Sequence, residues 1–379
     1  MRLKRDKLFK WHDPRMSREA RLRGRSNMIA FLKTAGRTTV IGFVVAVGFC
    51  ASAFAQSPIK LKVAYWGPNT THYFAGVDLV LGELERRTNG RLSFERYYSG
   101  SLVGAREIPD ALENGIADIG TVLSAYYPAK FPLANVGSLA GLNYHLWPVI
   151  MAYYQTYRDV PAFKDQLEKR GIRMMMPMGY GPYYVWSQKP IETIDDLKGL
   201  KFRGVGDQAK LLAALGVTPV FITPPEIYDA LSKGTIDGLL GDWDIAHGYK
   251  LYDVAKFHSL LPVGTSAAFL AMSTRTWNKL PADIQKILDD FVPEATRIFA
   301  RDYEITGFGE AKAAASAAGV KVVPVKAGVG EKVLEVAKRV SWEPWVKDME
   351  SKGLPGRKVL DTYIANIKKF VPQDTLKYD

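Results

Sequence analysis

Short apolar segments alternate along most of the chain with longer segments that have helical spacing. Residues 59–66 alternate between apolar and polar positions, residues 76–88 show helical spacing, and residues 91–97 alternate again. This order is typical of a strand–helix–strand unit. Helical segments also lie between most of the later strands, so we predict an α/β fold with largely parallel sheets. These further strands are expected at residues 117–123, 172–176, 183–187, 201–203, 218–221, 236–240, 267–272 and 320–324.

A segment of twelve residues occurs twice in similar form. Residues 107–118 read EIPDALENGIAD and residues 226–237 read EIYDALSKGTID, with seven identical positions. Each copy predicts a short helix closed by a glycine, Gly115 or Gly234, in the left-handed region, with a buried strand directly after it. The repetition predicts two similar α/β lobes, and pockets favour the cleft between such lobes.

A long helical pattern follows residue 280 and continues toward Gly319. We expect Pro293 to kink this element without ending it, and an element of this length could pass along both lobes. The predicted lobe boundaries are residues 56–178 plus 266–308 for lobe I and residues 179–265 plus 309–379 for lobe II.

The first 55 residues predict an export signal. An uncharged apolar segment at residues 40–50 follows basic residues and precedes an Ala-Phe-Ala sequence at residues 53–55. These features are typical of a signal peptide, and the apolar segment is too short to span a bilayer. We expect cleavage after Ala55, a periplasmic protein and no permanent membrane anchor. We interpret residues 1–27 as an extension that results from a start codon placed too far upstream.

Charge and cysteine content narrow the class of protein. The net charge is +12, but residues 1–55 hold 12 of the 51 Lys and Arg and only 3 of the 39 Asp and Glu. The rest of the chain is nearly neutral, so we expect no binding of nucleic acid. The one cysteine, Cys50, lies in the predicted signal, so the mature protein would have no disulfide and no cysteine-rich zinc site. We expect no metal and no cofactor.

Arg203 is the first candidate for a ligand contact. It ends the strand predicted at residues 201–203 and precedes a turn and a helix. A guanidinium can bind a carboxylate with two hydrogen bonds, and a helix N-terminus adds partial positive charge. The residues alone leave open that Arg203 pairs with an Asp on the surface. They also leave open a dinucleotide site, because residues 204–209 fit G-x-G-x-x-A, although the strand before them is short for that motif.

Aromatic residues gather where predicted strands end. Most aromatic residues at such positions belong to the core. However, apolar walls with one cation describe a pocket for a small organic acid. The clusters lie around Trp66 and Tyr73, at Tyr126 and Tyr127, between Tyr180 and Trp186, and at Trp243.

Several segments together resemble the DctP-type substrate-binding proteins of tripartite ATP-independent periplasmic (TRAP) transporters. They include KPIETIDDLKGLKFRG at residues 189–204 and TPPEIYDALSKGTIDGLLGDWDIAHGYKLYDVAK at residues 223–256, with further matches at residues 100–120, 130–142 and 273–288. The resemblance implies a two-lobed periplasmic binding-protein fold with a hinge and a long helix shared by both lobes. It also implies delivery of a ligand to the membrane subunits of a sodium-driven TRAP transporter.

The resemblance also implies roles for particular residues. The carboxylate-binding arginine of the family maps to Arg203, and an aromatic residue that lines the pocket maps to Trp243, with Asp242 beside it. Tyr183 stands where many members have a second arginine, and Gly241 stands where many have an asparagine. These departures favour a monocarboxylate with an apolar or aromatic body over a C4-dicarboxylate or sialic acid.

The predicted site therefore joins one cation to a set of aromatic side chains. Arg203 would bind the carboxylate, while the body of the ligand would lie against residues from both lobes. The alternative is an exported enzyme that acts on a carboxylate on the same scaffold, which would need a polar constellation opposite Arg203. The lining residues expected are Tyr183 or Tyr184, with Trp243 and Asp242, from one lobe and Trp66, with Tyr126 or Tyr127, from the other.

Overall fold

A computed structural model describes residues 57–142 and 145–374. The predicted signal peptide lies outside these residues. Within the described ranges, none of the helices has both the length and the apolar character that crossing a bilayer requires.

One mixed sheet organises the fold. Its strands follow the order β2-β1-β3-β8-β4-β7-β5-β6, and β9 pairs with β8. The strands are β1 (Ile59–Ala64), β2 (Leu92–Tyr97), β3 (Ile119–Val122), β4 (Ile172–Ser187), β5 (Lys201–Arg203), β6 (Thr218–Val220), β7 (Gly238–Gly241), β8 (Phe257–Ser273) and β9 (Lys321–Val323).

The centre of the sheet differs from the prediction. The strands expected at residues 172–176 and 183–187 are one strand, β4, and the strand expected at residues 267–272 is part of the longer β8. The expectation of largely parallel sheets is wrong here, because β4 and β8 pair antiparallel with each other and with β7 and β3. The strand passes residues 177–182, between the two segments expected as separate strands, with a shift of register beside Tyr180.

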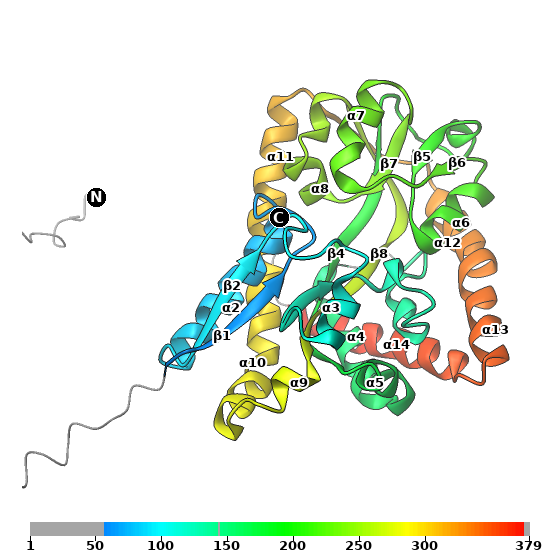
Figure 1. The fold of residues 1–379 in the computed structure, drawn as a ribbon. Helices are drawn as coiled ribbons and strands as arrows, with labels where there is room; N and C mark the ends of the chain where they lie inside the picture. Colours follow the sequence, from blue (N-terminus) through cyan, green and yellow to red (C-terminus); the bar gives the residue numbers. More distant parts are fainter. Residues whose placement is uncertain (1–56, 143–144, 375–379) are drawn as a thin grey trace, which may run out of the picture. The chain divides into compact units, whose positions relative to one another are not determined.

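Two similar half-sheets flank this centre, and Figure 1 shows β4 and β8 running between them. We call β2, β1 and β3 the first half-sheet, and β6, β5 and β7 the second half-sheet. In each, the middle strand, β1 or β5, pairs parallel with the other two. The helices that accompany the first are α2 (His72–Arg87) and α3 (Ile108–Asn114), and those of the second are α6 (Gly206–Ala214) and α7 (Ile227–Ser232).

The repeated segment occupies the same place in both half-sheets. Its two glycines, Gly115 and Gly234, have φ values of 74° and 67°, which confirms the predicted left-handed conformation. The last residue of each copy makes the same contact: Asp118 accepts a hydrogen bond from the Lys62 amide, and Asp237 accepts one from the Lys201 amide, both at 2.8 Å. The half-sheets are therefore equivalent residue by residue in this region.

The equivalence identifies the counterpart of Arg203. Ala64 pairs with Gly120, and Arg203 pairs with Leu239. Gly120 and Leu239 each lie two residues after the last Asp of their copy. Arg203 therefore occupies in the second half-sheet the position that Ala64 occupies in the first.

A long helical element connects the regions of the two half-sheets. Helix α10 (Ala282–Ala300) continues through Pro293, as predicted, into a π-helical segment, η7 (Arg301–Gly307), and then into α11 (Phe308–Ala317). In Figure 1 this element forms one column, in which α10 packs against α2 and α11 packs against α8 (Trp243–Gly248). The predicted lobe boundaries fall inside β4, inside β8 and at the start of α11, and they stay predictions.

The remaining helices pack around the centre of the sheet and at its edge. Helix α4 packs against β4 and against α14, which brings the C-terminal helix onto the core. These helices are α4 (Leu146–Asp159), α5 (Pro161–Glu168), α9 (Thr274–Trp277), α12 (Val329–Ala337), α13 (Glu343–Ser351) and α14 (Gly356–Phe370).

Candidate functional site

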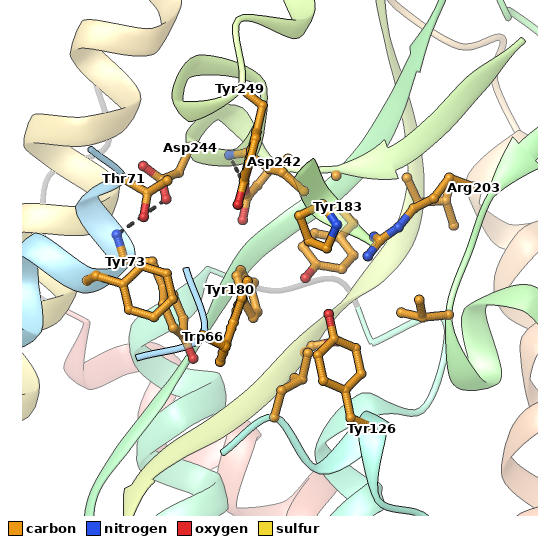
Figure 2. A pocket seen from close by; sticks show the side chains of 18 residues that line it. Trp66, Thr71, Tyr73, Tyr126, Tyr180, Tyr183, Arg203, Asp242, Asp244 and Tyr249 are labelled. Carbon is orange, nitrogen blue, oxygen red and sulfur yellow. Dashed lines mark hydrogen bonds between the residues drawn. The ribbon is translucent and has the colours of Figure 1, made fainter. Parts of the chain in front are cut away.

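A pocket lies between the two half-sheets, at the ends of β1, β3, β5 and β7. The space between its lining residues, open solvent included, is about 580 Å³, and Figure 2 shows the side chains that line it. Five of the predicted site residues line this pocket together: Trp66, Tyr126, Tyr183, Arg203 and Asp242. Residues up to 176 positions apart in the sequence thus meet because the half-sheets place their strand ends side by side.

Three candidate residues, Tyr184, Tyr127 and Trp243, do not line this pocket. Of the two pairs of alternatives, Tyr183 and Tyr126 are the ones that line it, and the expectation for Trp243 is corrected. Tyr184 follows Tyr183 on β4, and successive side chains of a strand point to opposite faces of a sheet. Tyr184 and Trp243 instead line a separate cavity of about 900 Å³ beside α11. Tyr127 is buried in the core, where its hydroxyl donates a hydrogen bond to the Ala105 carbonyl.

Arg203 is a buried cation that faces the pocket. It ends β5, is 5% exposed, and donates a hydrogen bond from Nε to the Ile222 carbonyl at 3.2 Å. Across the described part of the chain, it forms no ion pair with a carboxylate. The alternative of a surface arginine paired with an Asp is therefore wrong. A buried charge is costly unless it is paired, so this guanidinium is suited to an anion that enters the pocket.

Asp242 has a structural task at the edge of the pocket. It caps α8, where its Oδ1 accepts a hydrogen bond from the Ile245 amide at 3.0 Å, and its Oδ2 accepts one from the hydroxyl of Tyr303. Burial raises the pKa of Asp242 to about 6. Tyr303 belongs to η7, so the long helical element is tied directly to the pocket. Asp242 thus holds the wall in shape with both of its oxygens.

Asp244 lies in α8, which follows β7 of the second half-sheet, and it contacts the beginning of α2, which follows β1 of the first. Its Oδ1 accepts a hydrogen bond from the His72 amide at 2.8 Å, and its Oδ2 accepts one from the Tyr73 amide at 3.3 Å. These amides begin α2, so Asp244 caps a helix that lies far from it in the sequence. Burial, with the nearby charge of Asp242, raises the pKa of Asp244 to about 7.

The His72 side chain points into a separate acidic cluster beside this cap. Its Nδ1 lies 3.0 Å from Asp302 and its Nε2 lies 3.3 Å from Glu310. The hydrogen bond to Asp302 raises the pKa of His72 to about 9, so the imidazole is protonated at neutral pH. The cluster fastens the beginning of α2 to the long helical element.

Aromatic rings form most of the remaining wall. Tyr73 and Tyr180 stack with their centroids 4.5 Å apart, and Tyr180 also contacts Tyr183 at 5.8 Å. Trp66 and Tyr126 meet edge to face at 6.3 Å. Flat apolar walls of this kind suit a flat or apolar ligand body.

The lining residues expected from the sequence did not include Tyr73, Tyr180, Asp244 or Tyr249, which also line the pocket. Tyr73 and Tyr180 belong to aromatic clusters that the sequence shows, but spacing alone cannot tell a pocket wall from a core. Asp244 follows Asp242 by two residues, which is the only signal the sequence offers for it. Within residues 57–142 and 145–374, no cluster of three His, Cys, Asp or Glu side chains is suited to a metal ion.

A pocket between two similar half-sheets is typical of proteins that bind a small ligand between two lobes. Residues 63–348 match the bacterial extracellular solute-binding protein family 7, DctP, and the chain belongs to this family. The prediction from the sequence is confirmed, and the chain is a solute-binding protein, not an enzyme.

Two relatives and one solved structure illustrate the family. The monocarboxylate 2-oxoacid-binding periplasmic protein of Nostoc sp. strain PCC 7120 is 27% identical over 299 residues, which are 75% of this chain and 78% of that protein. A solute-binding protein of Sulfitobacter sp. strain NAS-14.1 is 30% identical, over 71% of this chain and 81% of that protein. The crystal structure of a TRAP solute-binding protein from Rhodoferax ferrireducens T118 with copurified benzoate has a TM-score of 0.76 and 27% identity, and covers 83% of this chain and 99% of that chain.

Proposed function

We propose that the protein binds a small monocarboxylate with an apolar or aromatic body and delivers it in the periplasm to the membrane subunits of a sodium-driven TRAP transporter. The observation that carries this proposal is Arg203, a buried cation that faces a pocket with aromatic walls. A carboxylate at Arg203 would form the ion pair that the described protein residues do not supply.

The free energy of binding must come from two sources. A hydrogen bond to a charged group contributes about 1.5–3 kcal/mol, whereas micromolar affinity requires about 8 kcal/mol. Burial of apolar surface contributes roughly 25 cal/mol per Å², so contact with Tyr180, Tyr183 and Trp66 has to supply much of the difference. A small hydrophilic acid would lack this contribution, which is why we expect an apolar body.

The relatives support this ligand class. One relative is named for binding monocarboxylate 2-oxoacids, and a protein of the same fold at 27% identity copurified with benzoate. Both ligands carry one carboxylate on a body without further charge. The pocket of this chain, with Arg203 as its cation and tyrosines as its walls, suits the same chemistry.

A thermal-shift screen tests the proposal. The exported protein is mixed with benzoate, mandelate, pyruvate, longer 2-oxoacids, dicarboxylates, sugars and amino acids, because a ligand that binds only the native state raises the midpoint of unfolding. We expect shifts from monocarboxylates that Arg203→Ala abolishes. Arg173→Ala is the control, because Arg173 stacks on Trp277 outside the pocket. Shifts from sugars or cationic ligands alone would contradict the proposal.

Delivery to the membrane needs a separate test. The liganded protein is added to proteoliposomes that contain the transporter subunits, with and without a sodium gradient. We expect uptake of the labelled acid only with the protein and the gradient together. Uptake that needs neither of them would contradict the proposed partner.

A further inference from the structure

Two helices begin at the pocket from opposite half-sheets. Helix α2 follows β1, and helix α6 follows β5, its equivalent in the second half-sheet. Thr71 precedes α2 and Val205 precedes α6, and both of these residues line the pocket. Because helix N-termini carry partial positive charge, the fold places two positions that favour an anion in one pocket.

The position at α2 already holds a carboxylate. Thr71 makes no side-chain hydrogen bond to the helix, and the amides of His72 and Tyr73 donate to Asp244. Asp244 is 3% exposed and lines the pocket beside them. An internal side chain therefore fills the place that an anionic group of a ligand would take.

The position at α6 is different. Val205 offers no side-chain acceptor, and in the part of the chain that the structure describes no carboxylate from the first half-sheet caps this helix. Asp207, in its first turn, is paired with Lys210 at 2.5 Å. Arg203 adds a full positive charge to this end of the pocket, so the second position is the one that remains for a ligand anion.

The end of the pocket near α2 still has polar groups for a ligand. Tyr180 is 8% exposed, and its hydroxyl is buried without a hydrogen-bond partner of good geometry in residues 57–142 and 145–374. The hydroxyl of Tyr73, which stacks on it, is buried beside it, close enough for a weak contact between the two hydroxyls that leaves each with capacity for another hydrogen bond. Buried hydroxyls of this kind suit a neutral donor or acceptor, such as a hydroxyl or carbonyl oxygen.

We propose that Asp244 determines which ligands the pocket accepts. Its carboxylate fills the anion position at α2. The pocket therefore accepts one ligand carboxylate, at Arg203, and only a neutral polar group at the opposite end. This inference rests on the proposed function and names the feature that excludes dicarboxylates. A second carboxylate near α2 would compete with Asp244 for the same amides. It would also lie near Asp242, and like charges that are buried together repel strongly.

The test compares Asp244→Asn with the wild-type protein by calorimetry. Asparagine keeps the size of the side chain and removes the resident charge. The probes are benzoate as the monocarboxylate and terephthalate, glutarate and adipate as dicarboxylates of different lengths. We expect the affinity for at least one dicarboxylate, relative to benzoate, to rise at least tenfold in Asp244→Asn.

Asp302→Asn is the matched control. Asp302, a residue of η7, also lies beside the beginning of α2, but it contacts the His72 side chain and not the helix amides. We expect its ratio of dicarboxylate to benzoate affinity to stay within about twofold of the wild-type ratio. A folded Asp244→Asn protein that binds benzoate and gains no dicarboxylate would overturn the inference, and so would an equal gain in Asp302→Asn.

A measurement on the wild-type protein covers the case in which Asp244→Asn does not fold. Between pH 8 and pH 6.5 most of the Asp244 population gains a proton, because burial and the nearby charge of Asp242 raise its pKa to about 7, whereas Asp242, with a pKa of about 6, and the ligand carboxylates stay largely ionised. The ratio of dicarboxylate to benzoate affinity should therefore rise at least threefold as the pH falls through this range. A constant ratio would overturn the inference. If the wild-type protein binds no carboxylate at any pH, the proposed function itself fails, which is a different result.

Discussion

The two half-sheets share one architecture and differ in the chemistry that they bring to the pocket. Asp118 and Asp237 hold equivalent strands in the same way. At equivalent positions near the pocket, however, the first half-sheet has Ala64 and the second has Arg203. The first contributes rings and the beginning of α2, whereas the second contributes the cation and the carboxylates. A duplicated scaffold thus becomes a binding site when only one copy carries charge.

The largest expected effect is on ligand binding, and it comes from placing alanine at position 203, so that both half-sheets have alanine at the equivalent positions 64 and 203. Arg203→Ala should weaken binding of the monocarboxylate at least tenfold, because a charge-assisted contact of about 1.5–3 kcal/mol is lost. The ligand-free variant should unfold at the same temperature or higher, since an unpaired buried charge is destabilising. Titration calorimetry and thermal unfolding measure the two effects. Unchanged affinity would remove Arg203 from the site.

Gly120 in β3 and Gly238 in β7 should respond differently to an added methyl group. A Cβ on Gly238 would lie 2.5 Å from the Trp186 carbonyl oxygen, whereas a Cβ on Gly120 would lie 2.6 Å from the Cγ2 methyl of the Ile108 side chain. A side chain can move and a paired strand cannot, so Gly238→Ala should cost about 1–3 kcal/mol and Gly120→Ala less. Urea unfolding of both variants checks this order. Equal losses would show that the two strands are equally rigid.

Replacement of the equivalent residues Asp118 and Asp237 should lower the stability of the protein by amounts that differ less than those for the two glycines. Asp118 also accepts a hydrogen bond from the Thr276 hydroxyl at 2.6 Å. Asp118→Ala should therefore destabilise the protein by about 1 kcal/mol more than Asp237→Ala, which is the usual contribution of one hydrogen bond. Thr276→Val is the control, because it should remove most of this difference. A larger loss from Asp237→Ala would contradict the assigned contacts.

The stability of the protein should also depend on pH. Burial raises the pKa of Asp242 to about 6 and that of Asp244 to about 7, from an ordinary value of 3.8. A raised carboxyl pKa favours the folded state most below pH 4, and this contribution is lost as the pH rises through 6 and 7. The midpoint temperature of unfolding of Asp244→Asn, compared with that of the wild-type protein, should therefore rise between pH 4 and pH 8. If the difference between the two midpoints stayed constant over this range, the raised pKa of Asp244 would be contradicted.

Part of the site was predictable because its signals are local. Arg203 stands between a strand and a helix, and the resemblance to the family marks the same residue. Trp66 and Tyr126 follow strands whose ends reach the pocket. These inferences need only the order of residues along the chain, since the ends of parallel strands meet at one edge of a sheet.

Other parts were not predictable for a physical reason. Tyr183 and Tyr184 are adjacent and alike in chemistry, yet only Tyr183 lines the pocket, and the register of β4 decides which one does. A change of one residue in register would exchange them. The sequence predicts separate strands at residues 172–176 and 183–187, and only the pairing of β4 with β8 shows a continuous strand.

The amino-acid sequence by itself determined the α/β class, the repeated segment with its left-handed glycines, the family, and the place of Arg203 at the end of a strand. Such features follow from periodicity, from backbone preference and from motifs that are local in the chain. Only the tertiary structure decided which aromatic faces meet the pocket and that Asp244 caps α2 from the other half-sheet. That contact joins residues 172 positions apart, and its geometry depends on how the two half-sheets pack, which no local pattern encodes.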